Sequence, residues 1–354
     1  MASFCDLLST GLIEKDESGD VLWTWSYPSV SSQQRDFFIH KSGLEKDSTH
    51  QVQFIYSRWQ HSWFYILSTA LDDVDTPLDK VNVVSLVLVT KDFNPERYET
   101  LCKLFSQLYI QTGNPAKILE NYLSVMTRGV CVNGENGKFS LKEFDTKQAY
   151  GKSQVRTVIE TFGVETILIY TALMLKKRIV VYGPAHSLID LLAFTRALPS
   201  LVWHRQNWEI LYPFLELRDE EINFIKSSSH YIAGFVEASV EGRNDLYDVF
   251  VNMSSGQITV APQAKEALAM GKLHKDIAMV MVKSTEDDNN TNQDIIKEIA
   301  NKTKELLNNL KSLCIEDEEH KSYITLESLR ERKMPPATEN FLFSLAACEG
   351  MVKL

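Results

Sequence analysis

The second half of this 354-residue chain alternates short apolar strands with helical segments, and that alternation restricts its possible folds more than any other feature. A strand-forming run, Ile179 to Tyr182, is followed by Gly183 and then by an amphipathic helical pattern. Strands that are separated by helices usually pair in parallel, with the helices on the sheet faces. We therefore expect an α/β unit with a largely parallel or mixed sheet covered by helices.

The first third of the chain shows strands followed by helices. Turns at Glu17–Asp20 and around Arg58–Ser62 each separate two extended runs, which predicts two hairpins, and Val81–Thr90 reads as a buried strand. Asn94-Pro95 and Asn114-Pro115 each offer an N-cap with proline at the first helical position. We expect an α+β lobe in which an antiparallel meander is closed by two helices.

These patterns give a domain plan. We expect an N-terminal lobe over residues 1–131, a polar, glycine-rich linker over 132–153, a central lobe over 154–283, an acidic mobile loop over 284–294 and a helical tail over 295–354. In the central lobe, helices are predicted at 155–162, 164–175, 187–198, 219–226 and 261–282, with Asp219 as the cap of the fourth. Strands are predicted at 179–182, 208–214, 230–238, 245–252 and 257–261.

Composition excludes several kinds of partner. A net charge of −10 disfavours nucleic acid and anionic lipid, because both require a basic face. No run reaches the roughly 18 consecutive apolar residues that span a bilayer, and the N-terminus has no basic leader. We therefore expect a cytoplasmic protein without direct membrane insertion. The cysteines are five in number and widely scattered, which favours reduced thiols: Cys5, Cys102, Cys131, Cys314 and Cys348.

The strand, glycine and helix around Gly183 raise the question of a bound nucleotide. A dinucleotide fold needs three glycines there, but Ala185 and Leu188 occupy the other two places, and Pro184 has no amide hydrogen to donate. A P-loop would need a glycine at Thr146. Neither HExxH nor GxSxG occurs. We expect no cofactor, no metal ion and no covalent catalysis; a cofactor-binding doubly wound enzyme is the third and last alternative.

Several stretches of the second half resemble the DENN domain: "ALMLKKRIVVYG", "LVWHRQNWEILYPFLEL", "HYIAGFVEASV" and "DLYDVFVNMSSGQITV". The N-terminal meander with two helices is similar to the longin-type lobe that precedes the DENN core, so the resemblance covers nearly the whole chain. Two departures stand out. Ser229-His230 lies where the family usually has proline, and Asn252 lies where it more often has aspartate.

The resemblance implies a bilobal DENN module, and DENN proteins are guanine nucleotide exchange factors for Rab GTPases. The partner would then be a nucleotide-free or GDP-bound Rab, held between the two lobes, and the nucleotide would belong to the Rab. The resemblance also implies a cytoplasmic location, peripheral to late endosomes and reached through protein partners. The alternative is a non-catalytic adaptor subunit of an endosomal recycling complex built on a coiled-coil heterodimer.

Candidate GTPase contacts come from three places. Strict alternation would put Val21, Trp23, Trp25 and Tyr27 on one strand face. For Trp23 and Trp25 burial in a core is the competing explanation, whereas Tyr27 ends the strand beside Pro28 and is the first choice. The hairpin tip offers Arg58 and Trp59, which would otherwise be an ordinary exposed turn. Lys176, Lys177 and Arg178 could face an acidic partner, or form a solvated strand edge. With Trp25 and Tyr27, these five residues complete the predicted site.

Overall fold

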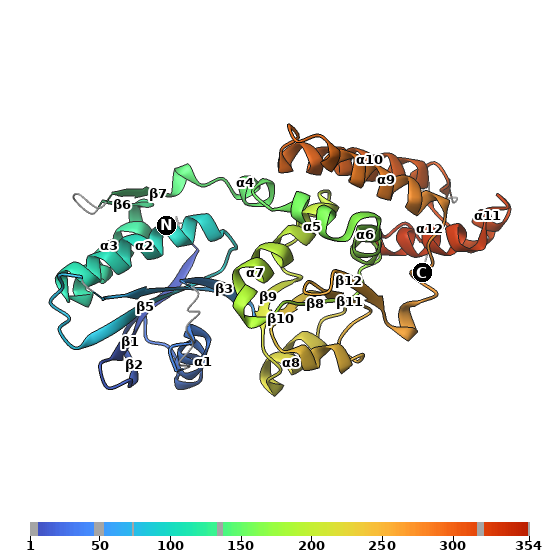
Figure 1. The fold of residues 1–354 in the computed structure, drawn as a ribbon. Helices are drawn as coiled ribbons and strands as arrows, with labels where there is room; N and C mark the ends of the chain where they lie inside the picture. Colours follow the sequence, from blue (N-terminus) through green and yellow to red (C-terminus); the bar gives the residue numbers. More distant parts are fainter. Residues whose placement is uncertain (1–5, 46–52, 73, 133–136, 317–321, 353–354) are drawn as a thin grey trace. The chain divides into compact units, whose positions relative to one another are not determined.

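The computed structural model describes residues 6–45, 53–72, 74–132, 137–316 and 322–352. By contacts the chain divides into two compact units, Met1–Ala149 and Tyr150–Leu354. Each unit has its own sheet and its own helices (Figure 1). Cys5 and parts of the predicted linker lie outside the described residues.

The first unit contains a five-stranded antiparallel sheet in the order β2-β1-β5-β4-β3. Both predicted hairpins and the predicted buried strand are confirmed. The strands are β1 (Leu7–Asp16), β2 (Val21–Tyr27), β3 (Phe54–Trp59), β4 (Ser62–Ala70) and β5 (Val81–Thr90). Consecutive residues of β4 point to opposite faces, and both faces are buried because helices cover each of them.

Helices α2 (Pro95–Thr112) and α3 (Pro115–Arg128) cover one face of this sheet, and α1 (Ser32–Ser42) covers the other (Figure 1). The predicted caps of α2 and α3 are confirmed, since Asn94 and Asn114 each accept a backbone N–H of the first turn. Helix α1 was not predicted. Its apolar residues are adjacent in sequence and show no helical period, but its capping box, Ser31 with Gln34, is a readable start signal.

The segment predicted as a linker contains short elements. A two-stranded ribbon pairs β6 (Val130–Val132) with β7 (Lys138–Ser140), and α4 (Thr146–Gly151) follows. A single 3₁₀ turn, η2 (Leu141–Glu143), connects the ribbon to α4. The division between the two units falls after Ala149.

The second unit contains the predicted mixed sheet, in the order β12-β11-β8-β10-β9. Strand β8 (Ile179–Tyr182) is central and pairs in parallel with β10 (Ile232–Phe235) and β11 (Val249–Asn252). Strand β9 (Leu211–Leu215) extends the parallel set, and β12 (Gln257–Val260) is antiparallel at the other edge. The mixed α/β fold expected from the alternating pattern is therefore present. Strand β8 has the predicted bounds, whereas β9, β10, β11 and β12 are shorter than predicted.

Helices cover both faces of this sheet (Figure 1). Helix α7 (Leu188–Ala197) packs on β9 and β10, and α8 (Asp219–Lys226) contributes Ile222 and Ile225 to the core on the opposite face. The other helices are α5 (Val155–Phe162), α6 (Thr166–Met174), α9 (Lys272–Glu286), α10 (Asn292–Lys311), α11 (Leu326–Arg330) and α12 (Pro336–Cys348), and the remaining 3₁₀ turns are η3 (Gly163–Glu165), η4 (Ala185–Ser187), η5 (Leu198–Val202), η6 (Ala238–Gly242) and η7 (Pro262–Ala264). A two-residue pair, β13 (Ile315–Glu316) with β14 (Ser322–Tyr323), lies within the tail predicted to be helical.

Two helix boundaries were predicted wrongly. Arg218, not Asp219, is the N-cap of α8, and Asp219 is the first helical residue, where its charge favours the helix dipole. The helix predicted over 261–282 is only η7 and α9, because Gly271 breaks the run and acts as the N-cap of α9.

The acidic loop predicted over 284–294 is much shorter. Helix α9 continues to Glu286, and α10 begins at Asn292 behind the capping box of Thr291 and Asp294. Arg156 of α5 determines the turn between them: its guanidinium donates to the carbonyls of Thr285, Asp287 and Asn290 at 2.6, 2.9 and 2.7 Å. The arginine thus pairs two carbonyls that the end of α9 would leave without a helical partner, those of Thr285 and Asp287, and a third in the following turn.

An ion pair joins the C-terminal end of helix α12 to the rest of the second unit. The Arg205 guanidinium donates to the Glu349 carboxylate at 2.5 Å and to the last carbonyls of α6, Leu173 and Met174, at 2.7 and 2.8 Å. A hydrogen bond from His204 and the charge of Arg205 lower the pKa of Glu349 from 4.5 to about 2. The contact therefore joins the end of α6 to the end of α12.

We predict that Gly234→Ala destabilises the second unit. A Cβ on Gly234 would lie 2.2 Å from the backbone oxygen of Pro213 in the neighbouring strand, so the strands would have to separate. We expect a loss of about 1–3 kcal/mol in the free energy of unfolding, measured by urea denaturation. Gly242→Ala is the matched control, because nothing lies within 4 Å of its Cβ position. Equal midpoints for the two variants would contradict this packing.

We predict that Glu349→Gln destabilises the chain in a pH-dependent way. Because the folded pKa is below the ordinary value, the carboxylate stabilises the fold above pH 4.5, and this stabilisation is lost as pH falls from 4.5 toward about 2. The variant should lose on the order of 1–3 kcal/mol at neutral pH, and its difference from the parent should shrink through that window. Denaturation midpoints across pH measure this. The exposed Glu298→Gln is the control, and a pH-independent difference would be the contrary result.

Candidate functional site

The predicted aromatic face of β2 is divided by a β-bulge. Leu12 of β1 is opposite Trp25, but the next residue, Ile13, is opposite Trp23, so β2 has one extra residue at Thr24. The alternation of side chains therefore reverses within the strand. The prediction that Val21, Trp23, Trp25 and Tyr27 share one face is wrong for this reason.

The two ends of β2 face different layers. The Trp23 ring stacks on Phe38 of α1 with centroids 6.1 Å apart, and it covers Gly11, whose Cβ position is 2.3 Å from the Trp23 ring. Tyr27 makes an edge contact with Tyr122 of α3, with centroids 5.7 Å apart, and is 38% exposed. Trp25 is half-buried on the same face as Tyr27. Tyr27 thus combines a packed ring edge with an accessible surface.

Arg58 and Trp59 are not at an exposed tip. Both belong to β3 and are only 7% and 9% exposed, because the turn is confined to Gln60 and His61. Trp59 packs on Phe37 of α1 with centroids 4.2 Å apart, and the Arg58 guanidinium lies over the Trp63 ring. The prediction that these two residues are surface anchors is wrong, since the register of the hairpin buries both.

Side chains of α7 and of the segment after β11 pack beside Gly183, at the turn between strand and helix. A Cβ on Gly183 would already meet Leu191 of α7 and Met253 at 3.4 Å. The Gly183 N–H donates to Phe235 O at 3.1 Å, and the Ser187 N–H donates to Pro184 O at 2.8 Å. Apolar side chains and backbone bonds therefore fill the carboxyl end of β8, where a doubly wound fold would bind its ligand.

The three basic residues before β8, Lys176, Lys177 and Arg178, differ in their contacts. The Arg178 guanidinium and backbone N–H both donate to the Asp248 carboxylate, which precedes β11, at 3.0 to 3.2 Å and 2.9 Å. Burial would raise the pKa of Asp248, but the hydrogen bonds from Arg178 lower it. Arg178 therefore joins two parallel strands and is not a freely available cation. Lys176 is exposed and Lys177 half-buried, and neither has an ion pair within the described residues.

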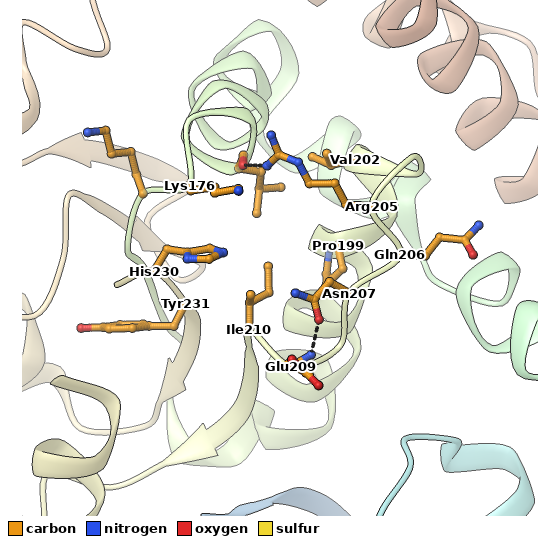
Figure 2. A pocket seen from close by; sticks show the side chains of 12 residues that line it. Lys176, Pro199, Val202, Arg205, Gln206, Asn207, Glu209, Ile210, His230 and Tyr231 are labelled. Carbon is orange, nitrogen blue, oxygen red and sulfur yellow. Dashed lines mark hydrogen bonds between the residues drawn. The ribbon is translucent and has the colours of Figure 1, made fainter. Parts of the chain in front are cut away.

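A pocket of about 480 Å³ opens where three parallel strands begin. The residues directly before β8, β9 and β10 line it, because parallel strands start at the same edge of a sheet: Lys176 and Lys177, Ile210, and His230 with Tyr231. The α7–β9 connection and the end of α6 complete the wall with Pro199, Val202, Arg205, Gln206, Asn207, Glu209 and Leu173. Figure 2 shows the His230 ring, Ile210 and Asn207 extending toward one another across the cavity.

Three cationic side chains, Lys176, Lys177 and Arg205, line the pocket together with one carboxylate, that of Glu209. Burial lowers the pKa of His230, and the nearby charges of Lys176 and Arg205 lower it further. Arg205 is held by Glu349, and Asn207 is held by the Glu209 N–H, which donates to Asn207 Oδ1 at 2.8 Å. Lys176 and Gln206 adopt left-handed backbone conformations with φ of 50° and 41°. Such conformations are uncommon outside glycine and concentrate at functional sites.

A second pocket, of about 460 Å³, lies in the first unit between α2 and α3 and β6. Lys117 and Glu120, both on α3, form an ion pair at 3.0 Å, and Arg128 donates to Ser124 at 2.8 Å. Its polar groups therefore bind one another, and Cys131 on its floor is buried with a pKa raised to about 11 by burial. This pocket offers neither a nucleophile nor an unpaired charge cluster.

Other chemistry is not assembled in the described part of the chain. No three His, Cys, Asp or Glu side chains there gather closely enough to hold a metal ion. Cys102, Cys131, Cys314 and Cys348 are free thiols. One helical stretch, Ala149–Met174, is long and apolar enough to cross a membrane, but most of it is buried in the protein, where α5 and α6 pack against α9. Burial in the core explains its composition.

Reasoning from the sequence missed His230, Asn207 and Arg205 as pocket residues. The available signal was positional. Each parallel strand is preceded by a residue that lines the pocket: Lys176 and Lys177 before β8, Ile210 before β9 and His230 before β10. Strands that pair in parallel bring such positions to one edge of the sheet. The order of strands in the sheet, which was not predicted, decides which of these positions become neighbours.

Comparison with known proteins gives the family. The family profile described as "SPA: Stabilization of polarity axis" matches residues 152–262, which contain the whole second sheet. DENN domain-containing protein 10 of Danio rerio is 45% identical over 348 residues, covering 98% of both chains. The Homo sapiens protein of that name is 43% identical over 349 residues (98% and 97%), and the Dictyostelium discoideum protein is 39% identical over 358 residues (97% of both). The chain therefore belongs to the family of DENN domain-containing protein 10.

Proposed function

We propose that this protein is a guanine nucleotide exchange factor that promotes GDP release from a Rab GTPase. The observation that carries the proposal is the chain-long similarity to DENN domain-containing proteins, because DENN domains are associated with Rab exchange. The packing of Leu191 and Met253 against Gly183 at the carboxyl end of β8 is consistent with a nucleotide that belongs to the partner.

Exchange requires only differential binding. A surface that binds the vacant GTPase better than the loaded one weakens nucleotide binding by the same factor, because the linkage is reciprocal. A thousandfold weakening corresponds to about 4 kcal/mol of differential contact. A few well-placed aromatic anchors can provide an energy of this size.

We place the principal contact of the first unit on strand β2. It is an edge strand that pairs only with β1 among the described residues, so its outer backbone groups are available to a partner segment. Leu22, Trp25 and Tyr27 share the face of β2 that the bulge turns toward α3, and Leu22 is 57% exposed. Apolar and aromatic side chains beside an open edge suit the switch segments of a GTPase.

Arg58, Trp59 and Arg178 are left out of the proposed contact because they are buried or paired with Asp248. Lys176 and Lys177 are also left out of this contact, because they line the pocket at the start of the parallel strands. We further propose that the protein acts in the cytoplasm at late endosomes and reaches them through protein partners, since a net charge of −10 opposes non-specific attraction to an anionic surface.

We predict that the parent chain accelerates release of labelled GDP from at least one member of a Rab panel. Tyr27→Ala should lower kcat/KM about 30-fold or more, since an interface anchor typically contributes 2 kcal/mol or more. Tyr27→Phe keeps the ring contact with Tyr122 and removes only the hydroxyl, so it distinguishes the contribution of the hydroxyl from that of the ring. Ile189→Ala, at a side chain of the second unit that is 63% exposed, is the matched control and should behave as the parent. Unfolding midpoints check that each variant is folded.

Two outcomes would contradict exchange. One is no acceleration with any Rab, and the other is equal affinity for vacant and nucleotide-loaded Rab in a pull-down. Nucleotide-independent, stoichiometric capture of coiled-coil subunits would then favour the adaptor function. A fully active Tyr27→Ala variant would contradict the assignment of β2 to the contact, but it would not contradict the exchange activity.

A further inference from the structure

We propose that the pocket at the start of β8, β9 and β10 binds the phosphate groups of a compact phosphorylated ligand, of the inositol phosphate class. The ligand is either a soluble inositol phosphate or the same headgroup on a lipid. This role is independent of nucleotide exchange, because it needs the second unit alone and no GTPase. It assigns Lys176, Lys177, His230 and Asn207 to one binding site.

The cations of the pocket carry the first part of the argument. Lys176 and Lys177 have no ion pair within the described residues, and both line the cavity. Their charges act on neighbouring groups: Lys176 disfavours protonation of His230, and Lys177 favours ionisation of Asp248. An anion in the cavity would be attracted by both lysines. Glu209 is the only acidic residue in the lining, and Glu349, behind the wall, is engaged by Arg205 and His204.

Neutral donors of the pocket are oriented in advance. Asn207 Oδ1 accepts the Glu209 N–H at 2.8 Å, which fixes the amide so that its NH₂ group is directed into the cavity (Figure 2). The His230 ring also extends into the cavity, and its Nδ1 lies 3.1 Å from Ser229 Oγ, which leaves Nε2 for a ligand. Oriented donors in a cavity that lysines also line are a favourable environment for phosphate oxygens.

Two residues that line the pocket have an unfavourable, left-handed backbone conformation. Lys176 and Gln206, from different segments, both have left-handed φ angles, and both line the cavity. Arg205 lies beside Gln206 and joins the end of α6 to Glu349 of the C-terminal segment. The surrounding structure therefore holds the backbone of the pocket in place on two sides, as is typical of a preformed ligand site.

Size and charge select the ligand class. A cavity of about 480 Å³ is within the usual range for a small-molecule site. A net charge of −10 opposes an extended anionic surface such as nucleic acid, so a compact polyanion fits better. Leu173, Val202 and Ile210 give the pocket an apolar wall against which a sugar-like ring can pack.

The test titrates the full-length chain with inositol trisphosphate by calorimetry at physiological salt. The double substitution Lys176→Gln and Lys177→Gln should weaken binding at least about tenfold, because two charge-assisted contacts are lost. Asn207→Asp should also weaken it, since this change keeps the oxygen that accepts the Glu209 N–H but replaces the NH₂ with a negatively charged oxygen. Lys304→Gln, at an exposed position of α10, is the matched charge control and should bind as the parent.

A second arm uses phosphatidylcholine vesicles with and without phosphatidylinositol bisphosphate. Binding of inositol trisphosphate without vesicle binding supports the proposal and identifies a soluble ligand. Phosphoinositide-dependent vesicle binding that the lysine substitutions abolish supports it and identifies a lipid headgroup. No binding to either probe overturns the proposal, as does unchanged binding by the folded double variant. Because no GTPase is present, failure here leaves the proposed exchange activity unaffected.

Discussion

Strand β8 has no free edge, and this constraint determines which end of the second unit can receive a ligand. It is bonded in parallel to β10 on one side and to β11 on the other, and Arg178 at its start is bound to Asp248 before β11. The next connections must cross over on the sheet faces, so α7 packs down onto the carboxyl end. Leu191 and Met253 fill that end. The pocket with Lys176, Lys177 and His230 opens at the opposite end, where the parallel strands begin.

This arrangement separates the molecule from a nucleotide-binding doubly wound enzyme that shares its local order of strand, glycine and helix. In such an enzyme the backbone after the first strand is bare and its amide groups point at a phosphate. Here the corresponding N–H of Gly183 bonds Phe235 and its Cα faces apolar side chains. The same local order therefore serves packing, and the charged groups that could bind phosphate come from the segments before the strands.

Strong local signals predicted most elements correctly. Proline at the first helical position behind an asparagine cap gave α2 and α3, and continuous apolar runs gave β5 and β8. Helix α1 was missed because its two phenylalanines are adjacent and are buried only by the sheet beneath them. Arg58 and Trp59 were placed at a tip because a turn of five residues was assumed, whereas the hairpin closes over two, which puts both side chains in β3.

The sequence by itself determined the two kinds of sheet, the N-caps of α2 and α3, the family resemblance and the lack of a glycine-rich phosphate loop, because each depends on residues close together in the chain. Tertiary structure decided which side chains meet. The bulge in β2 turns Tyr27 toward α3 and Trp23 toward α1, and the strand order gathers Lys177, Asn207 and His230 around one cavity. Register and strand order arise from packing between distant segments, and no short window of sequence contains that information.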